Sequence, residues 1–477
     1  EDGWWYKFGQ HATRIAMSVR NFSFTYKNTY AMTLPGFRPE VGDMFGQKKH
    51  GGFLAPGMDF AFGFTGDGYI DRALQNDWLI CNDSVVSPAS SNALEDLQLR
   101  ISLEPIRDLK IDLTANRTRN RSREIQYMFE GMPDTRSGNF SMSIISIGSA
   151  FERPSAGDGY HSGTFERFRR NLDVIRDRVE SQFLGAQYPQ GSILAGKTFD
   201  PANGTISKHS PDVMIPAFLA AYTGKSARNS ALDFFPSLFS MMPNWRITYT
   251  GLTKIAWFKK NFRSVNLNHA YRSTYSVGSY NTFQSFMSYM GDIGFVEDVQ
   301  SGNPIPSSRF DISMVSINEQ FSPLIGMDAT LKNGLTAKVE YKTSRILNLS
   351  MSACQLVETA SRDFVIGLGY KIVNFNLFSG RNVKDSKNRV SHDLALRADI
   401  SFRNQSALCR DIQQGFAQAT NGNKALKISC SADYTLSRLL TLRLYYDRQQ
   451  NTPLVSSSSY PVVSADFGFS MKFSLTR

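Results

Sequence analysis

The stretch DLALRADISFR, residues 393–403, alternates apolar and polar side chains at every second position. Successive side chains of an extended strand point to opposite faces, so this spacing predicts a β-strand with one apolar and one polar side. The apolar row comprises Leu394, Leu396, Ala398, Ile400 and Phe402, and the polar row comprises Asp393, Ala395, Arg397, Asp399, Ser401 and Arg403.

The same alternation recurs along most of the chain, which predicts an all-β protein built from many strands. Near Arg20 and Asn21 the apolar phase shifts by one residue, which predicts a β-bulge. The other alternating segments lie at residues 15–26, 97–103, 109–115, 335–341, 364–372, 426–434, 440–446 and 467–475.

The length of these runs favours a transmembrane antiparallel β-barrel over a soluble β-sandwich, which also alternates. The runs extend over about 9 to 13 residues, whereas an average globular strand has about 5 to 6 and a tilted membrane strand needs about 9 to 11. The polar rows carry charges of both signs, as expected for a water-filled lumen. The residues predicted to line this lumen are Arg100, Lys110, Asp112, Arg397, Asp399, Lys427 and Arg443. The alternative is that these side chains only solvate the inner wall.

Composition narrows the functional classes further. The chain has 477 residues, 12% aromatic residues and a net charge of +11 from 53 Lys and Arg against 42 Asp and Glu. This aromatic content argues against disorder, and no apolar run reaches the roughly 18 to 20 residues of a spanning helix. The positive charges are dispersed, with the densest run at 117–123, so nucleic-acid binding is not expected. The first residue is Glu1, from which we expect a processed chain or a fragment.

One region departs from the strand pattern and divides the chain into three parts. Residues 1–151 and 244–477 are predicted barrel strands, and residues 152–243 are a predicted, partly helical insertion between strands. Two alternatives remain for the insertion, namely a locally packed element, which we favour, or a lumen or rim element that contacts a partner.

Two helices are expected within the insertion. The first begins at Thr164 as N-cap and ends at Gly185. The second begins at Ser210 with Pro211 in its first position, ends at Gly224, and is expected to kink at Pro216. The apolar positions of the first helix are Phe165, Phe168, Leu172, Ile175, Val179 and Phe183.

A Gly- and Pro-rich segment, residues 34–68, is predicted to form a long loop on the strand scaffold. Long loops of this kind are often functional, and this one could fold into the lumen or line an opening. Within it GFTGDG, residues 63–68, lacks the strand and helix context of a nucleotide-binding loop and is interpreted as a turn.

No catalytic, cofactor or metal site is predicted, and the chain is not expected to be an enzyme. The six histidines are scattered, and the carboxylates Asp67 and Asp71 lack the further ligands of a calcium site. Cys409 and Cys430 could form a disulfide across a hairpin or remain two free thiols. The remaining cysteines are Cys81 and Cys354.

Several phrases, in order and across nearly the whole chain, resemble the C-terminal part of the SprA/Sov family. These are the giant outer-membrane translocons of the Bacteroidetes type IX secretion system. The phrases are LPGF, APGMDFAFGF, DWL, LRISLEPIRDLKIDLTANRT, SPDVMIPAFLAAYTGK, MPNWRITYTGL, FRSVNLNHAYRSTYSVGSY, SPLIGMDATLKNGLTAKVEYKTSR, IGLGYKI, SADYTLSRLLTLRLYYDRQQNTPLVSSSSYP and FGFSMKFSL.

The resemblance implies a protein-conducting channel in the bacterial outer membrane that exports folded cargo proteins. It implies one very large barrel of about 36 strands, with a lateral opening at which a smaller barrel protein docks and a periplasmic plug protein. The implied partners also include the remaining N-terminal part of the same barrel and outer-membrane lipid, with no nucleic acid and no cofactor. The chain departs from the family in length, because it holds only about 15 to 17 plausible strands.

Other functions remain alternatives at this point. An outer-membrane solute transporter barrel would need an N-terminal plug domain, which is not seen in this sequence. A soluble all-β surface adhesin would share the alternating pattern but not the strand length. An outer-membrane enzyme is disfavoured, because no nucleophile or acid–base pair is recognised.

Overall fold

The computed structural model describes residues 18–40, 42–43, 45–66, 68–82, 87–126, 134–373, 375, 393–436, 439–455 and 460–473. Strands account for 55% of the structure and helices for 16%, which confirms an all-β protein. Several predictions fall outside the described residues: the first positions of the strand at 15–26, residues 474–475 of the last predicted strand, and Asp67.

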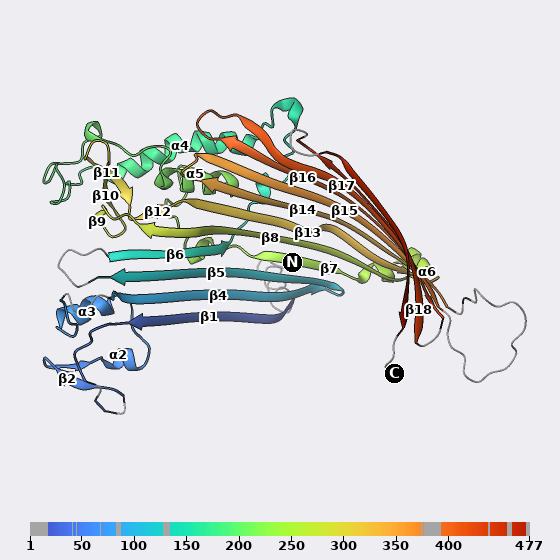
Figure 1. Ribbon diagram of the computed structural model, residues 1–477, viewed down its shortest axis with the longest axis horizontal. Helices are drawn as coiled ribbons and strands as arrows, with labels where there is room; N and C mark the ends of the chain where they lie inside the picture. Colours follow the sequence, from blue (N-terminus) through green and yellow to red (C-terminus); the bar gives the residue numbers. More distant parts are fainter. Residues whose placement is uncertain are drawn as a thin grey trace, which may run out of the picture.

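One antiparallel sheet of fourteen strands forms the body of the molecule (Figure 1). Its strands are β1 (Val19–Thr33), β4 (Ala89–Ile106), β5 (Leu109–Ile125), β6 (Asp134–Ser143), β7 (Asn244–Tyr249), β8 (Phe262–Thr282), β12 (Phe310–Ile312), β13 (Met314–Leu331), β14 (Leu335–Ser350), β15 (Gln355–Ile372), β16 (Leu394–Asp411), β17 (Ala417–Thr435), β18 (Leu440–Pro453) and β19 (Val462–Phe473).

The strands follow one another across the sheet nearly in sequence order. The order is β1-β4-β5-β6-β8-β13-β14-β15-β16-β17-β18-β19, with β7 paired to β5 and β8, and β12 paired to β8. Among the described residues β1 pairs only with β4 and β19 only with β18, so this sheet has two open edges and does not close on itself. In Figure 1 the sheet curls strongly toward β18 and β19.

The register of the sheet sorts its side chains into two faces, because residues directly opposite each other in an antiparallel pair lie on the same face. A row of apolar residues runs from Tyr341 through Phe364 and Phe402 to Leu426. We call the face that carries this row the apolar face. The opposite face, which carries Lys342, Asp363 and Arg403, is the polar face.

The predicted bulge in the first strand is confirmed, because the register of β1 against β4 shifts between Val19 and Asn21. A second irregularity was not predicted. The register of β13 shifts between Phe321 and Ile325, around Pro323, which has no backbone N–H to donate to the ladder.

The helical insertion lies between β6 and β7, over residues 144–243, and contains α4 (Gly163–Ser181) and α5 (Pro211–Tyr222). The predicted cap of α4 is wrong, because Ser162 is the N-cap and accepts a hydrogen bond from the Phe165 N–H at 3.1 Å. Ser210 precedes α5 with Pro211 at its first turn, as predicted, and the helix continues through Pro216. The 3-10 helices of the insertion are η1 (Ile147–Ser149), η2 (Ala156–Asp158), η3 (Pro201–Asn203) and η4 (Leu238–Ser240).

The Gly- and Pro-rich segment is not a plain loop but the start of a small folded module, residues 34–82. Its core packs against Ala89 and Ile125 at the ends of β4 and β5, on the apolar face. The module contains β2 (Lys48–His50), β3 (Phe53–Ala55), α2 (Met58–Ala61) and α3 (Tyr69–Gln75). In Figure 1 it lies beside β1, at the same end of the sheet as α4 and α5.

The remaining elements are a small sheet and a short helical connection. The small sheet joins β9 (Met287–Met290), β10 (Ile293–Glu297) and β11 (Pro304–Ser308), and the connection between β7 and β8 holds η5 (Gly251–Lys254) and α6 (Ala256–Asn261). No described helix is both long enough and apolar enough to cross a membrane.

The main hydrophobic core forms between the insertion and part of the apolar face. Phe168, Ile175 and Phe218 of the helices are fully buried and pack in one cluster with Val315 of β13 and Leu347 of β14. Each such side chain contributes about 1.5 to 3 kcal/mol when it leaves water. The insertion is therefore a packed layer over the sheet at one end of the strands, as the locally packed alternative describes.

Candidate functional site

All seven residues predicted to line a lumen lie on the polar face. Gly369 and Arg397 are paired across β15 and β16, as are Gly367 and Asp399. Lys427 pairs with Ser401, and Arg443 with Asp433. Toward the β1 edge of the same face, Arg100 pairs with Thr114, Asp112 pairs with Arg246, and Lys110 pairs with Thr248.

The polar face is hydrated and carries charges of both signs. Lys110 and Asp112 lie 3.2 Å apart, Lys338 and Lys342 both approach Glu340, at 3.0 and 2.9 Å, and Arg403 approaches Asp363 at 3.0 Å. Most of these cations are exposed, so each pair contributes only about 0 to 1 kcal/mol. The arrangement leaves a water-wetted surface without a large field of one sign.

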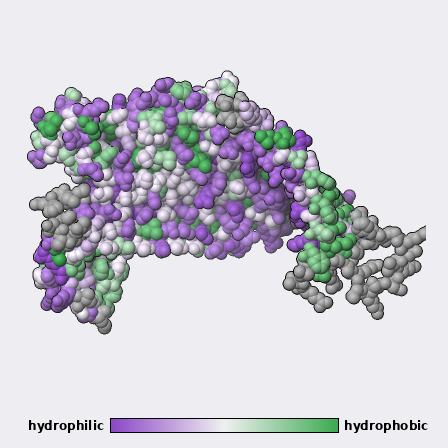
Figure 2. Space-filling view, viewed as in Figure 1, coloured by the Kyte–Doolittle hydropathy of each residue, from purple (hydrophilic) through white to green (hydrophobic). Residues whose placement is uncertain are grey.

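Two shallow cavities bring predicted residues together on this face. Arg100 and Asp112 line a cavity of about 460 Å³ with Arg246 and Arg272. Arg397 and Asp399 line one of about 470 Å³. Lys427 and Arg443 line neither cavity. Figure 2 shows that the surface over the central strands is largely hydrophilic.

Sequence reasoning missed several polar-face residues. Arg246 lies on β7, which is too short for a clear period of two, and Arg272 lies on β8 among mixed polar and aromatic neighbours. Asp328 lines the second cavity and follows the irregularity in β13, which shifts the register by two residues and leaves the faces of the strand unchanged. The signal that could have found Asp328 is its position between the apolar-face residues Met327 and Ala329.

The apolar face has one half without a cover, which we call the apolar band. On β15 it extends from Phe364 to Ile372 and on β16 from Leu394 to Phe402. Its outermost strands are the most exposed: the exposed fraction is 73% for Phe467 on β19 and 56% for Phe24 on β1. The length of the segment on β15 is similar to that of a tilted strand that crosses a bilayer, which is about 9 to 11 residues. In Figure 2 hydrophobic surface gathers around the strand labelled β18 in Figure 1.

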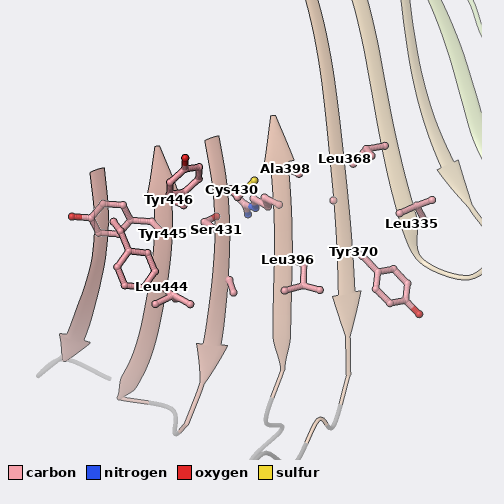
Figure 3. A pocket seen from close by; sticks show the side chains of 14 residues that line it. Leu335, Leu368, Tyr370, Leu396, Ala398, Cys430, Ser431, Leu444, Tyr445 and Tyr446 are labelled. Carbon is pink, nitrogen blue, oxygen red and sulfur yellow. The ribbon is translucent and has the colours of Figure 1, made fainter. Parts of the chain in front are cut away.

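A hollow of about 320 Å³ lies within the apolar band, across β14 to β19 (Figure 3). The small side chains among its lining residues are those of Ala398, Cys430 and Ala432, on the paired strands β16 and β17. Larger side chains surround it, among them Leu335, Leu368, Tyr370, Leu444 and Tyr446. Large contiguous apolar patches on protein surfaces are typical of sites that contact lipid or another protein.

The other half of the apolar face lies under the insertion and contains buried ion pairs. Glu319, 2% exposed, accepts hydrogen bonds from Ser146 Oγ at 2.7 Å, Tyr271 Oη at 2.8 Å and Arg345 Nη2 at 2.7 Å. Arg345 Nη1 also donates to the Ser149 carbonyl oxygen at 2.6 Å, which ties β14 to the start of the insertion.

A second buried pair repeats this arrangement two strands away. Arg410 Nη2 donates to Glu358 at 3.1 Å and Arg410 Nη1 donates to the Tyr160 carbonyl oxygen at 2.6 Å. Within the insertion Glu152 accepts from Ser162 Oγ, Thr164 Oγ1 and the Thr164 N–H. Partial burial raises the pKa of Glu152, but these hydrogen bonds outweigh it and hold the pKa below its ordinary value.

The cysteine and carboxylate chemistry is sparse. Cys409 and Cys430 are free, and they lie on opposite faces of neighbouring strands, so they do not form the disulfide that was one alternative. In the described part of the chain no three His, Cys, Asp or Glu side chains come together as metal ligands.

Comparison with known proteins adds no assignment. No protein-family model matches the chain, and no curated protein matches it.

Proposed function

We propose that this chain forms part of the wall of a very wide outer-membrane β-barrel that conducts folded proteins, as in the type IX translocons that its sequence resembles. The observation that carries the proposal is the division of single strands into two faces. One face is apolar and uncovered over a membrane-spanning length, and the other is polar and ion-paired over the same length. This division is what a strand between lipid and a water-filled lumen requires.

The open edges of the sheet support a barrel wider than this chain. Barrel diameter grows roughly linearly with strand number, and about 16 to 18 strands already leave an aqueous channel. The fourteen-stranded sheet does not close on itself in the described residues. A wall completed by more than four further strands would enclose a lumen larger than that of a porin.

The orientation in the membrane follows from the connections. At the band end of the strands β4 joins β5, and β13 joins β14, through turns of two or three residues. At the opposite end lie the module 34–82 and the small sheet β9 to β11, and the insertion 144–243, which leaves the sheet near the middle of β5, covers that half of the strands. Short turns face the periplasm and long connections face the exterior in outer-membrane barrels, so we place the insertion outside the cell. The longer connections between β7 and β8 and between β15 and β16 are exceptions to this rule.

The insertion is not the plug in this proposal. It covers the apolar face, whereas the lumen side is the polar face. Hydrogen bonds between Ser146, Ser149 and Tyr160 of the insertion and the buried ion pairs of β13 to β16 also fix it to the wall. A wide pore that is not sealed would leak, so the seal comes from another segment or a separate periplasmic plug protein, and cargo displaces that seal.

The alternatives make different predictions for the same features. A soluble adhesin would leave the apolar band in contact with water over six neighbouring strands, which monomeric soluble proteins rarely do. A small-solute transporter has the same wall but a narrow, occupied lumen. Pore width therefore distinguishes a translocon from a solute transporter.

The decisive experiment is reconstitution of the complete barrel, with its seal removed, in planar bilayers. We expect a conductance well above that of a porin of about 16 to 18 strands, and passage of a folded fluorescent protein through the same barrel in vesicles. A porin-sized conductance, or exclusion of the folded protein, contradicts the proposal.

A pair of variants tests which face lines the pore. Arg397→Glu reverses a charge on the polar face and is expected to shift ion selectivity toward cations. Arg170→Glu is the matched control, since Arg170 is exposed on α4 on the other side of the wall. Equal selectivity of the two variants would contradict the assignment of the polar face to the lumen.

A further inference from the structure

The densest run of positive charge in the sequence, RTRNRSR at 117–123, forms an arginine row on β5 that the proposed function does not use. Its four arginines occupy every second position, so all four lie on the apolar face, in the half near the insertion. Neighbouring residues on one face of a strand are about 7 Å apart. Four guanidinium groups at this spacing repel one another unless anions lie between them.

Protein carboxylates neutralise part of this row. Glu95 accepts from Arg121 at 2.7 Å and lies 3.5 Å from Arg117. Arg123 donates to Asp71 at 3.1 Å and to Asp134 at 3.0 Å. Arg117, Arg121 and Arg123 therefore each contact at least one carboxylate.

Arg119 differs from its neighbours, because within the described residues no carboxylate lies in ion-pair contact with it. Its guanidinium lies 4.9 Å from the centre of the Phe235 ring, and its Nε is enclosed without a hydrogen-bond partner. A cation–π contact offsets only part of the cost of burying such a charge.

A fifth arginine aggravates the imbalance. Arg136 of β6 is directly opposite Arg123 in the register, so two like charges face each other across the strands. Among the described carboxylates Arg136 contacts only Asp134, at 3.4 Å, and Arg123 already binds that carboxylate at 3.0 Å. The Nε of Arg136 is also enclosed without a partner.

Arg119 and Arg136 meet at a small cavity of about 80 Å³ between the sheet and the β9–β10 hairpin. Tyr280 and Ser91 line it from β8 and β4. Tyr280 lies flat against the sheet because Gly138 beneath it has no Cβ, which would come within 2.6 Å of the Tyr280 hydroxyl. The carboxylate Asp292 also lines the cavity, but it accepts a hydrogen bond from Arg309 at 3.0 Å.

We propose that this cavity binds one oxyanion of the phosphate class between Arg119 and Arg136. The planar guanidinium fork matches the oxygen geometry of such an anion. The charge comes from Arg119, which no described carboxylate contacts, and from Arg136, which shares Asp134 with Arg123. The cavity has room for one oxyanion group and not for a nucleotide. Its ligand is a free phosphate ion or the phosphate of a lipid headgroup, two sources with the same chemistry.

The test is thermal unfolding of the full chain in detergent, in sodium phosphate and in sodium chloride at equal ionic strength. We expect a saturable rise in the unfolding temperature with phosphate only. Arg119→Gln and Arg136→Gln are each expected to weaken phosphate binding by about tenfold or more, since one charge-assisted hydrogen bond is lost. Arg20→Gln, at an exposed pair with Glu104, is the control and leaves phosphate binding unchanged.

Lipid-borne phosphate is tested with the same variants on vesicles of phosphatidylcholine with and without phosphatidic acid. A response to these vesicles but not to free ion assigns the lipid source, and a response to the free ion assigns inorganic phosphate. Arg119→Lys keeps the charge and provides a second test if the glutamine variant does not fold. It is expected to bind phosphate more weakly than the wild type. Equal stability in phosphate and chloride without a vesicle response, or unchanged binding by both glutamine variants, overturns the proposal.

Discussion

The two halves of the apolar face belong to the same strands, yet they differ in their cover and in the charged residues that they hold. On β15 the apolar-face positions from Phe364 to Ile372 hold apolar residues and lack a cover, whereas Leu356 and Glu358 lie under the insertion. On β16 the same change occurs between Phe402 and Arg410. β15 and β16 therefore each combine an uncovered apolar segment with a segment that lies under the insertion.

The difference shows what each environment permits. The covered half buries Glu319 with Arg345 and Glu358 with Arg410, because the insertion supplies hydroxyl and carbonyl partners for them. The apolar band holds no such pair among the residues described for β15 and β16. Removal of a buried charge should therefore destabilise the covered half, and addition of a charge to the apolar band should destabilise the band.

The largest effect is expected for Glu319→Ala, which leaves Arg345 buried without its counter-ion. We expect a loss of about 3 to 5 kcal/mol in the stability of the covered half. The measurement is hydrogen exchange of α4 and α5 in the detergent-solubilised protein, with β18 and β19 as the internal reference. The double variant Glu319→Met with Arg345→Met should recover most of the loss, and exchange equal to wild type in the single variant would refute the role of this pair.

A somewhat smaller effect is expected when a charge enters the apolar band. Ala398→Arg places a cation near the middle of the band on β16, at an expected cost of about 2 to 4 kcal/mol for folding into lipid vesicles. Ser429→Arg is the matched control, because Ser429 lies on the polar face opposite Asp399 and Asp447. Urea titrations of vesicle-inserted protein that show equal costs for both variants would remove the distinction between the faces.

The insertion should also respond to pH through Asp212, at the start of α5. Burial raises the pKa of this carboxyl, although it accepts hydrogen bonds from Ser308 and Ser307. A carboxyl with a raised pKa contributes stability that is complete below its ordinary pKa and is lost as the pH rises through the folded value.

Protection of the α5 amides should therefore increase from neutral to mildly acidic pH, where Glu152, with its lowered pKa, remains ionised. Asp212→Asn has no proton to lose, and it is expected to keep this protection at neutral pH. A pH profile that does not change in the variant would show that Asp212 does not control the response.

The smallest effect is expected on the polar face, at the exposed pair of Asp363 and Arg403. Asp363→Ala should cost less than about 1 kcal/mol, because water screens and replaces the interaction. Glu358→Ala removes a carboxylate from the same strand β15 on the covered half and should cost several times more. Similar unfolding midpoints for these two variants would contradict the contrast between the faces.

The strand pattern was predictable from sequence wherever residues of the apolar band alternate with polar residues. The stretch 393–403 predicts β16 and both of its faces, and the seven predicted lining residues share one face for the same reason. The predicted runs are shorter than the strands. They end early because Glu358 and Arg410 interrupt the apolar alternation on the apolar face. Their burial depends on the insertion, which no local pattern reveals.

The helix cap illustrates the same limit at one residue. Ser162 and Thr164 both carry hydroxyl groups suited to an N-cap. Both hydroxyls donate to Glu152, and Ser162 also accepts the Phe165 N–H. Residue type does not decide between the two, whereas Ser210 followed by Pro211 predicts the start of α5 from local chemistry alone.

The most direct test of the account is spin-label accessibility along residues 394–403 of the vesicle-inserted protein, with the native cysteines replaced. We predict that labels at Leu396, Ala398 and Ile400 are accessible to oxygen in the lipid, and that labels at Arg397, Asp399 and Ser401 are accessible to a water-soluble nickel complex. An alternation with a period of two supports a wall between lipid and water. Equal exposure of both rows to the aqueous probe would contradict it.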